Sequence, residues 1–593
     1  MAEQLLERSQ VDQSRTWDLS LLFKSQKDFQ EAARIFEKDV ISFEKHYKGQ
    51  LTDDDSIISA LKDYNQLLIQ ADWLGSYCYL APTVDAYGKE AGQNLVFYEP
   101  IASAFSVRTS FFKNVLASLS KESMVKVKEV FPDAIYFIEQ VKRFNPHRLS
   151  PEVEETLAQL NGDLFNHLDS YETSKFKDMV FDDFEVEGET YPNSYVLFEN
   201  DYEMDLRTEV RRAAFDSFHK TLKKYRHSAA DQYIRQVRLE KKLAHMRGFK
   251  SVFDYLLFDQ QVTRKEYDRQ LDVIMEELAP VMRRYVKILQ QAHGLDKMTI
   301  KDVKVSLPSE ASKVTIDDAL VRLKDAFSIL GEDYTAMIQR AFDERWIDFP
   351  MNLGKSTGGF CSSVYGGPSY VLLSWTGLMN ELLVLAHELG HAGHFQNANA
   401  NNAAIVPEVS LYCIEAPSTA NEVIMCQYLL SHLSDPEEKR NLTAEFLSRT
   451  YFHNMVTHLL EAYYQREVYE LVDKGAYIDA DTLDSIFKKT LEKFWGPDVE
   501  ISEGAELTWM RQPHYYMGLY SYTYSAGLTI GTQVGLKMVK DPQKYASKWL
   551  EVLKAGGRVT PYSFAAGVDV DITTDQALKD TIAYIGKLVD SLE

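Results

Sequence analysis

The stretch Leu385-Ala386-His387-Glu388-Leu389-Gly390-His391 decides the local fold and the chemistry expected of this chain. Leucines recur through it at helical spacing, which predicts a buried helix: Leu378, Leu382, Leu385 and Leu389. Residues i and i+4 share a helix face, so the rings of His387 and His391 can reach one metal ion. Glu388 lies beside that face, where a carboxylate can accept a proton from water held at the metal.

The alternative is that these residues are ordinary core residues. A single histidine on an apolar helix face is usually packed without any ligand. Two imidazoles and a carboxylate on one buried helix are costly to bury unless something binds them. The pattern therefore predicts a site for one Zn²⁺ ion, with zinc favoured over manganese or cobalt by ligand type alone.

The third metal ligand has to come from another element. One class of zinc helix carries glycine and histidine three and six residues after its second histidine, but this chain has His394 and Asn397 there. We assign His394 to packing or to support of a ligand. Glu415 and Glu422 are predicted to share a face at the start of a helix, so one could bind metal while the other holds a ligand histidine. Spacing alone leaves Glu408 as a rival.

Most of the remaining chain has helical periodicity. Residues 24–49 and 53–80 alternate charges with apolar residues at helical spacing. Thr263-x-x-Glu266 predicts a capping box ahead of a long amphipathic helix, with a kink at Pro280. Asp205 is expected to cap another long helix.

Two stretches favour strands instead. Residues 180–198 alternate apolar and acidic residues around Glu187-Gly188, which predicts a hairpin that includes Tyr195-Val196-Leu197-Phe198. Residues 346–375 are rich in glycine, serine and β-branched residues, which predicts short strands and tight turns. The change of pattern places a boundary near residue 200.

Composition restricts the class of protein. The chain has 593 residues, 65 basic and 88 acidic, for a formal net charge of −23, which argues against a nucleic-acid partner or an anionic membrane. With 12% aromatic residues, extensive disorder is not expected. Four cysteines without CxxC spacing, no signal-like start and no long apolar run predict a cytoplasmic location.

An aromatic tract near the C-terminus offers neutral hydrogen-bond donors. Within eleven residues it contains His514, Tyr515, Tyr516, Tyr520, Tyr522 and Tyr524. Such donors suit an oxyanion that develops in a transition state. The alternative, an aromatic core helix, explains the four-residue spacing of Tyr520 and Tyr524 equally well.

These motifs together resemble a known family. Residues 387–394, His-Glu-Leu-Gly-His-Ala-Gly-His, followed by Glu415-x-x-Ser418-x-x-x-Glu422, are similar to the M3 family of zinc metallopeptidases, which includes thimet oligopeptidase. Trp17-Asp18-Leu19, Gly358-Gly359-Phe360-Cys361 and the tract 513–524 resemble its oligoendopeptidase F branch, so the resemblance spans nearly the whole chain.

The resemblance implies a fold and a site. The fold it implies is mainly α, with two helical lobes around a deep substrate channel and a small β component near the zinc. Residues 1–200 would form an N-terminal helical lobe and residues 201–593 the catalytic domain. Glu415 would be the third zinc ligand and Glu422 its support. His514 matches the family's substrate-binding histidine, and Tyr524, then Tyr520, are expected to stabilise the transition state.

A peptide could bind beside the zinc helix. Residues 368–374 are predicted to form a short strand whose exposed edge could add a peptide strand, although a core strand is the alternative. Gly358 and Gly359 would let the backbone approach closely. Tyr370 and Tyr515 complete the expected substrate-binding residues.

The expected function is zinc-dependent hydrolysis of internal bonds in oligopeptides. One alternative is a zinc aminopeptidase, which needs an acidic cluster for the free amine, and none can be assigned. Another is a peptide-binding protein with a structural zinc, but such sites favour several cysteines and only Cys413 lies near Glu415. The acidic balance predicts a preference for cationic peptides that weakens with salt.

Overall fold

The computed structural model describes residues 6–307, 313–356 and 358–593. The described residues form mainly helices, with one two-stranded and one three-stranded sheet among them, so the mainly-α class is confirmed. The chain divides into two compact units. Unit 1 comprises Met1–Asn161, Ser312–Val409 and Lys537–Val568, and unit 2 comprises Gly162–Ala311, Ser410–Leu536 and Asp569–Glu593. None of the helices in the described ranges is both long and apolar enough to cross a bilayer.

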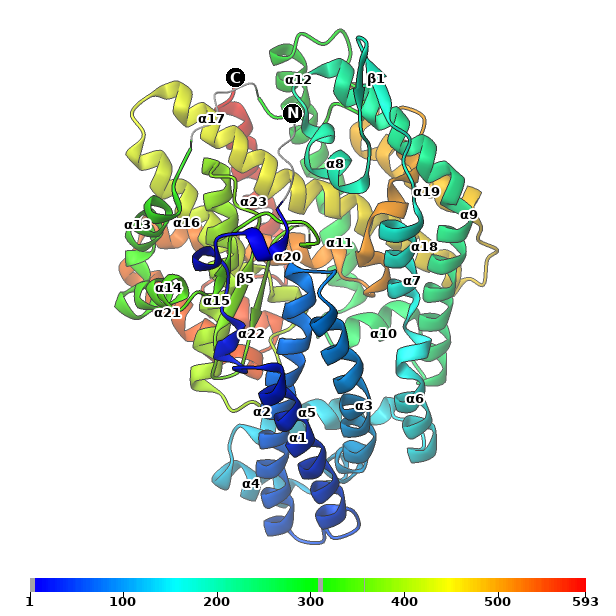
Figure 1. The fold of residues 1–593 in the computed structure, drawn as a ribbon, viewed down its shortest axis with the longest axis vertical. Helices are drawn as coiled ribbons and strands as arrows, with labels where there is room; N and C mark the ends of the chain where they lie inside the picture. Colours follow the sequence, from blue (N-terminus) through cyan, green and yellow to red (C-terminus); the bar gives the residue numbers. More distant parts are fainter. Residues whose placement is uncertain (1–5, 308–312, 357) are drawn as a thin grey trace. The chain divides into compact units, whose positions relative to one another are not determined.

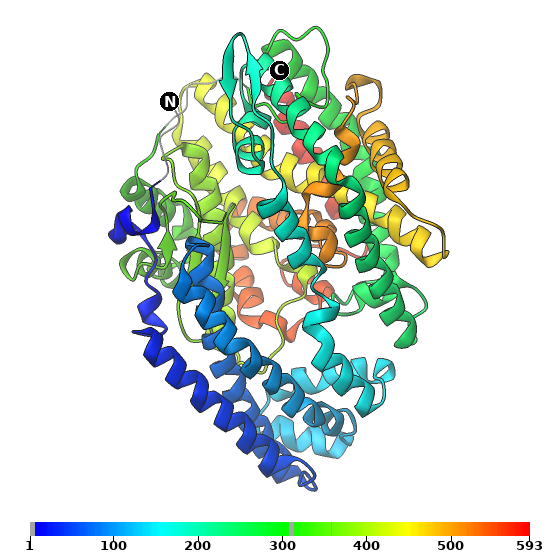
Figure 2. The same cartoon turned by 45° about the vertical axis from the view of Figure 1, so that its right-hand side comes forward.

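A helical bundle forms the N-terminal part of unit 1 (Figure 1). Helices α1 (Gln26–Tyr47), α2 (Asp54–Val84) and α3 (Lys89–Ala117) pack side by side, and the turned view separates them clearly (Figure 2). Phe29, Phe36 and Phe43 recur every seven residues on α1 and are all buried. The two helices predicted within residues 24–80 are confirmed. Shorter helices α4 (Lys121–Val130) and α5 (Ala134–Phe144) complete the bundle.

The three-stranded sheet of unit 1 has the order β3-β5-β4. Strand β5 (Ser369–Leu372) pairs in parallel with β3 (Ile347–Asp348) and antiparallel with β4 (Phe360–Ser363). The strands predicted within residues 346–375 are confirmed, but the predicted exposed edge at 368–374 is wrong. Within that segment, Ser369–Leu372 form the central strand and are fully buried. In the described ranges, β4 pairs with no strand other than β5.

Trp17 and Asp18 fasten the N-terminal segment to this sheet. The Trp17 ring meets the Tyr370 ring edge-on, with centroids 5.7 Å apart. The Tyr370 hydroxyl donates to the Asp18 carbonyl at 2.8 Å. Asp348 on β3 is completely buried and receives bonds from Arg8 and Lys355.

Helix α15 (Met379–Asn401) follows the sheet. It packs against β4, β5 and α21 (Pro542–Ala555). Helices α13 (Ile316–Ala326), α14 (Glu332–Asp343) and α22 (Pro561–Ala566) also belong to this unit. The helix that carries both histidines is therefore held by a sheet that precedes it and a helix that comes much later in the chain.

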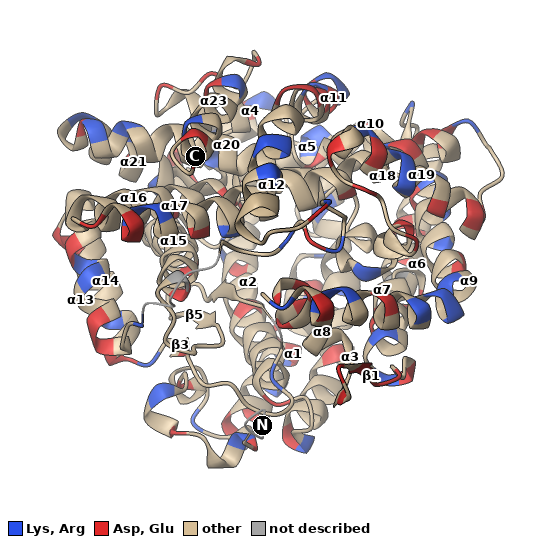
Figure 3. Cartoon of the chain, turned by 90° about the horizontal axis from the view of Figure 1, so that it is seen from above, with Lys and Arg blue, Asp and Glu red and all other residues tan. Residues whose placement is uncertain are grey.

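Unit 2 is built from long helices. Its main members are α9 (Thr208–Met246), α16 (Ala416–His432), α18 (His458–Asp473), α19 (Ala480–Trp495), α20 (Ser521–Lys540) and α23 (Gln576–Asp590). Shorter helices are α7 (His167–Thr173), α10 (Val252–Phe258) and α17 (Pro436–Phe446). Helices α6 (Pro151–Leu164) and α20 cross unit boundaries, since α6 begins in unit 1 and α20 ends in it. Lysines and arginines share helices such as α9 with aspartates and glutamates (Figure 3).

Helix α11 (Arg264–Val273) begins with the predicted capping box of Thr263 and Glu266. The interruption at Pro280 takes the form of a five-residue π-helix, Ile274–Leu278, ahead of α12 (Ala279–Ala292). The cap predicted at Asp205 is wrong. Arg207 occupies the N-cap of α9, and Asp205 accepts a bond from the Arg207 backbone at 2.8 Å instead.

The predicted hairpin is shorter than expected. Its strands are β1 (Phe184–Val186) and β2 (Glu189–Tyr191), joined by Glu187 and Gly188 in left-handed conformations. The extension through Tyr195–Phe198 is wrong, because Tyr195–Asn200 form helix α8. Ser194 caps that helix by accepting a bond from the Leu197 backbone at 3.2 Å. None of the unit boundaries falls at residue 200, and the division into functional domains at that point stays a prediction.

Candidate metallopeptidase site

The side chain of Glu381 stabilises the N-terminus of α15. Its carboxylate accepts bonds from the backbone of Thr376, Gly377 and Leu378 at 2.8, 2.9 and 3.2 Å. These groups belong to the segment that leads into the first helical turn, and a carboxylate in that turn also suits the helix dipole. The histidine pair two turns further on therefore sits on a firmly anchored helix.

His387 and His391 lie together on α15, as the sequence predicts. Their ring centroids are 5.0 Å apart, and each ring offers a nitrogen within 4.8 Å of the other. His391 is buried and His387 half-buried. The two imidazoles can therefore serve one ion from one helix face.

Glu388 is 4% exposed and lies under the Gly358-Gly359 turn. A Cβ at Gly359 would lie 3.0 Å from Glu388 Oε1 and 3.3 Å from the Leu372 carbonyl, so only glycine fits without displacing a neighbour. Gly358 has φ +84°, which also favours glycine. Burial and the Glu388 carboxylate raise the pKa of the Cys361 thiol well above its usual value. Gly358 and Gly359, just before β4, thus cover the carboxylate that the helix presents.

His394 is a packed imidazole. It is 1% exposed, and among the described residues neither ring nitrogen has a hydrogen-bond partner. Its ring stacks on Phe395 and contacts Phe564. Burial lowers the pKa of His394 to about 3, so the ring is neutral. Glu408, the rival ligand, is exposed, and within the described part of the chain it joins no group of three potential ligands.

Glu415 stands at the N-cap of α16 in unit 2, where the sequence places the start of a helix. It is 7% exposed, and its Oε2 accepts a bond from the buried Ser418 hydroxyl at 2.9 Å. Glu422, two turns on, is also buried and accepts a bond from Thr450. Its predicted support of a ligand histidine stays a prediction.

Three glycines let α20 approach α16 closely. We call Gly527, Gly531 and Gly535 the glycine stripe; they recur every four residues and so share one helix face. A Cβ at Gly527 would lie 2.7 Å from the Glu415 Cβ, and one at Gly531 would lie 2.7 Å from the Ala416 carbonyl. The stripe therefore fixes the distance between Glu415 and the helix that carries Tyr524.

Three members of the aromatic tract gather around one point. Ring centroids of His514 lie 5.5 Å from those of both Tyr520 and Tyr524, and the two tyrosine rings are 5.4 Å apart. The Tyr524 hydroxyl is 3.5 Å from His514 Nε2. Burial, then Tyr520 and Glu415, raise the pKa of Tyr524 well above its usual value, so it is a neutral donor.

The other members of the tract turn into the core. Tyr522 is completely buried and donates to Gln260. Tyr515 is 1% exposed and packs between Tyr233 and Tyr464. Tyr370 is likewise buried. The substrate-binding roles expected of Tyr370 and Tyr515 stay predictions.

Glu461 was missed by sequence reasoning. It lies on α18, is 2% exposed, and its Oε2 is 3.3 Å from His514 Nδ1 and 2.9 Å from His458 Nδ1. The His453 and His458 Nε2 atoms are 3.2 Å apart, which extends the chain of contacts. Burial favours the protonated form of Glu461, but His458 and His514 outweigh it and hold the pKa far below its usual value. The group is thus an ionised carboxylate among histidines.

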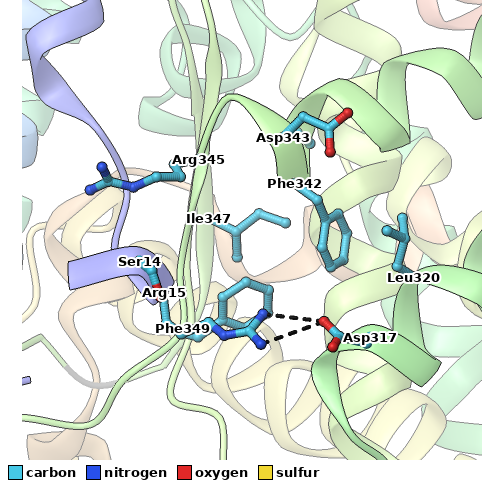
Figure 4. Close-up of a pocket in the computed structure, with 10 residues that line it drawn as sticks. Ser14, Arg15, Asp317, Leu320, Phe342, Asp343, Arg345, Ile347 and Phe349 are labelled. Carbon is cyan, nitrogen blue, oxygen red and sulfur yellow. Dashed lines mark hydrogen bonds and ion pairs between the residues drawn. The ribbon is translucent and has the colours of Figure 1, made fainter. Parts of the chain in front are cut away.

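A separate pocket of about 200 Å³ lies in unit 1 (Figure 4). The pocket is lined by the N-terminal segment, α13, α14 and β3. Two of its lining residues, Arg15 and Asp317, form an ion pair at 3.4 Å. The pocket contains none of the site residues predicted from the sequence.

Comparisons with known proteins agree on a family. The model of peptidase family M3 matches residues 203–584. The chain is 25% identical to Oligopeptidase PepF of Bacillus subtilis over 603 residues, covering 100% of this chain and 89% of the relative. It is 25% identical to Group B oligopeptidase PepB of Streptococcus agalactiae over 584 residues, covering 96% and 94%. The crystal structure of oligoendopeptidase-F from Enterococcus faecium shares the fold, with TM-score 0.75, 21% identity and coverage of 95% and 98%.

A mainly helical fold that presents two histidines and a glutamate on one helix, with these relatives, defines a metallopeptidase, which is a hydrolase. The chain belongs to peptidase family M3. Its candidate functional residues come from both units: the histidine pair and Glu388 from unit 1, and Glu415, Glu422, Glu461 and the aromatic tract from unit 2.

Proposed function

We propose that this chain is a zinc-dependent endopeptidase that hydrolyses internal bonds of oligopeptides. The observation that carries the proposal is the pair of His387 and His391 on one face of α15, with the buried Glu388 next to that face, in a chain of family M3. Restriction to short peptides is supported by the relatives, two of which are named oligopeptidases.

His387, His391 and Glu415 are the proposed zinc ligands. Two imidazoles and one carboxylate, with a fourth position left for water, are the ligand set of many catalytic zinc sites, so the residues fit the metal. The Ser418 hydroxyl bonds Glu415 Oε2 and fixes the carboxylate's orientation, as supporting contacts of metal ligands commonly do. Glu422 is proposed as a further support. When bound, zinc supplies a Lewis acid that makes water a stronger nucleophile at neutral pH.

Glu388 is the proposed general base. Its carboxylate accepts the proton of the attacking water, and the water oxygen forms a bond to the scissile carbonyl carbon. The same carboxyl group then delivers that proton to the leaving amine as the peptide C–N bond breaks. Burial under the Gly358-Gly359 turn keeps the carboxylate away from bulk water, which strengthens its electrostatic effect.

His514 and Tyr524 are the proposed oxyanion donors, with Tyr520 beside them. A neutral tyrosine hydroxyl can donate to the oxygen that gains negative charge. The raised pKa of Tyr524 keeps its proton in place at neutral pH, which supports this role.

The peptide backbone is proposed to pair with β4 rather than β5. Strand β5 already has two neighbours, while β4 has none but β5 in the part of the chain that the structure describes. Main-chain hydrogen bonds to β4 would give affinity that tolerates many sequences. Gly358 and Gly359 immediately precede β4 and bring it next to Glu388.

A pair of quenched fluorescent peptides tests the function. Both have the same sequence of about ten residues, one with a free and one with an acetylated N-terminus. We expect equal cleavage of both at an internal bond, loss of activity with a chelator, and recovery with one equivalent of Zn²⁺. Cleavage of the free peptide alone would indicate an aminopeptidase. Binding without cleavage in the zinc-loaded protein would indicate a peptide-binding protein.

A further inference from the structure

We propose that Glu461 is a positioning residue that holds both oxyanion donors, His514 and Tyr524, in their working orientation. The inference rests on the proposed function, because it concerns the same donors. Glu461 and everything it contacts belong to unit 2.

One carboxylate oxygen collects three donors. Glu461 Oε2 accepts from His458 Nδ1 at 2.9 Å, from the Ser521 hydroxyl at 3.1 Å and from His514 Nδ1 at 3.3 Å. Since an ionised carboxylate is an acceptor only, both rings must carry their proton on Nδ1. The Nε2 of His514, 3.5 Å from the Tyr524 hydroxyl, then faces away from Glu461, and it can donate to an oxyanion only when the ring is a doubly protonated imidazolium. Glu461 therefore selects the tautomer and the ring plane of His514.

Tyr524 is held by the same carboxylate through two routes. His458 stacks on the Tyr524 ring, with centroids 4.0 Å apart and planes inclined by 13°. Ser521 is the first residue of α20 and lies three residues before Tyr524, so the two share a helix face. Glu461 bonds both His458 and Ser521, which ties the phenol ring to the imidazole of His514.

His453 contacts His458 on the side of the ring that faces away from Glu461. Because His458 carries its proton on Nδ1, its Nε2 is an acceptor, and His453 Nε2–H donates to it at 3.2 Å. Burial and the neighbouring His458 lower the pKa of His453 well below its usual value, so this ring is neutral and its tautomer is fixed. The hydrogen bonds from His453 through His458 thus point toward Glu461, and His514 donates to the same carboxylate.

Glu461→Gln is the informative variant. It keeps the shape and one acceptor oxygen but removes the negative charge, and Glu461 Oε1 has no hydrogen-bond partner among the described residues, so the amide nitrogen disturbs no existing bond. We expect kcat to fall about 10- to 100-fold, the usual range for losing a support of a catalytic group, with KM within about twofold and zinc content unchanged.

Glu240→Gln is the matched control. Glu240 is also a buried carboxylate of unit 2, but it accepts from Gln236 and Tyr469 and touches no donor of the proposed site. It should keep kcat within about twofold. A Glu461→Gln variant with kcat like that of the control would overturn the inference.

A cycle of variants separates positioning from general structural damage. In the His514→Ala/Tyr524→Phe background, we expect Glu461→Gln to cause no further loss beyond about twofold, because its targets are gone. An equal loss in both backgrounds would refute the positioning role. If His514→Ala and Tyr524→Phe each leave kcat at the wild-type value, the oxyanion assignment itself fails. If they lower kcat while Glu461→Gln does not, only the role of Glu461 fails.

Discussion

The imidazole of His458 lies flat against the phenol of Tyr524, with ring centroids 4.0 Å apart and planes inclined by only 13°. Tyr520 meets Tyr524 edge-on, with ring centroids 5.4 Å apart. A stacked ring has less rotational freedom than one held at its edge, and a transition-state donor has to be held in place in advance. The stack on His458 restrains the Tyr524 ring, which supports the proposal of Tyr524 as the principal donor.

Tyr524→Phe should lower kcat by about 10²-fold, the usual cost of removing one oxyanion donor, with little change in KM. Tyr520→Phe should have a smaller effect. Steady-state kinetics on an internally cleaved peptide measure both. Tyr522→Phe is the control, because that hydroxyl donates to Gln260 inside the core and should affect stability rather than kcat. A larger loss for Tyr520→Phe would reverse the assignment.

Glu388→Gln should abolish turnover while metal binding persists. The amide cannot accept the water's proton, and general acid–base catalysis typically contributes about 10²- to 10⁴-fold. Metal analysis alongside kinetics tests the pair of expectations. Glu381→Gln, on the same helix, should lower stability by about 1–2 kcal/mol through weaker capping but leave kcat nearly intact. Near-normal turnover in Glu388→Gln would remove the general base from the mechanism.

Glu415→Gln should weaken zinc binding strongly, because it replaces a charged ligand with a neutral amide. Glu408→Gln should leave zinc content unchanged, since Glu408 is exposed and belongs to no candidate group in the described ranges. Titration with a competing chelator ranks the two variants. The opposite order would make Glu408 the ligand that spacing alone allowed.

Gly527→Ala should reduce both stability and kcat. The new methyl group would lie 2.7 Å from the Glu415 Cβ, so α20 has to move away from α16. Overpacking of this kind costs about 1–3 kcal/mol, which exceeds the gain of about 1 kcal/mol in helix propensity. Thermal unfolding and kinetics report the two effects.

Gly586→Ala provides the contrast, because the nearest atom to its new Cβ is an Arg284 nitrogen at 3.8 Å. There the propensity gain should dominate, and kcat should not change. If Gly527→Ala behaved in the same way, the close approach of α16 and α20 would not matter.

Stability should respond to pH through Glu240. Burial raises the pKa of this carboxyl from its usual value of 4.5 to about 7. The folded state therefore holds the proton more tightly, and stability falls as pH rises from about 4.5 to about 7. Glu240→Gln removes this dependence, so its melting temperature relative to wild type should be higher at pH 8 than at pH 5. A constant difference at the two pH values would contradict the shifted pKa.

Local patterns were predictable from the sequence. Helical periodicity located α15, and the positions of His387 and His391 on one face follow from their four-residue spacing. The capping box at Thr263 and the helix starting at Glu415 are equally local. Each of these features depends on residues within one or two turns, and their side chains alone determine them.

Features that depend on distant partners were not predictable. Val371 pairs with Ile347, which makes β5 a central strand. The residues within 368–374 do not indicate that β3 is their pairing partner. Glu461 and His514 are 53 positions apart and meet only because α18 and the aromatic tract pack together. The close approach at the glycine stripe could have been predicted from the sequence, because glycines four residues apart within a helix indicate close packing.

The interleaving of the two units has a consequence for synthesis. The chain passes from one unit to the other after residues 161, 311, 409, 536 and 568, so unit 1 is not complete until its last segment has been made. Helix α15 packs against α21, which begins at Pro542. A ribosome-bound chain that stops before this point leaves one side of the histidine-bearing helix uncovered. The histidine-bearing helix is therefore among the parts of the molecule whose packing waits for nearly full-length translation.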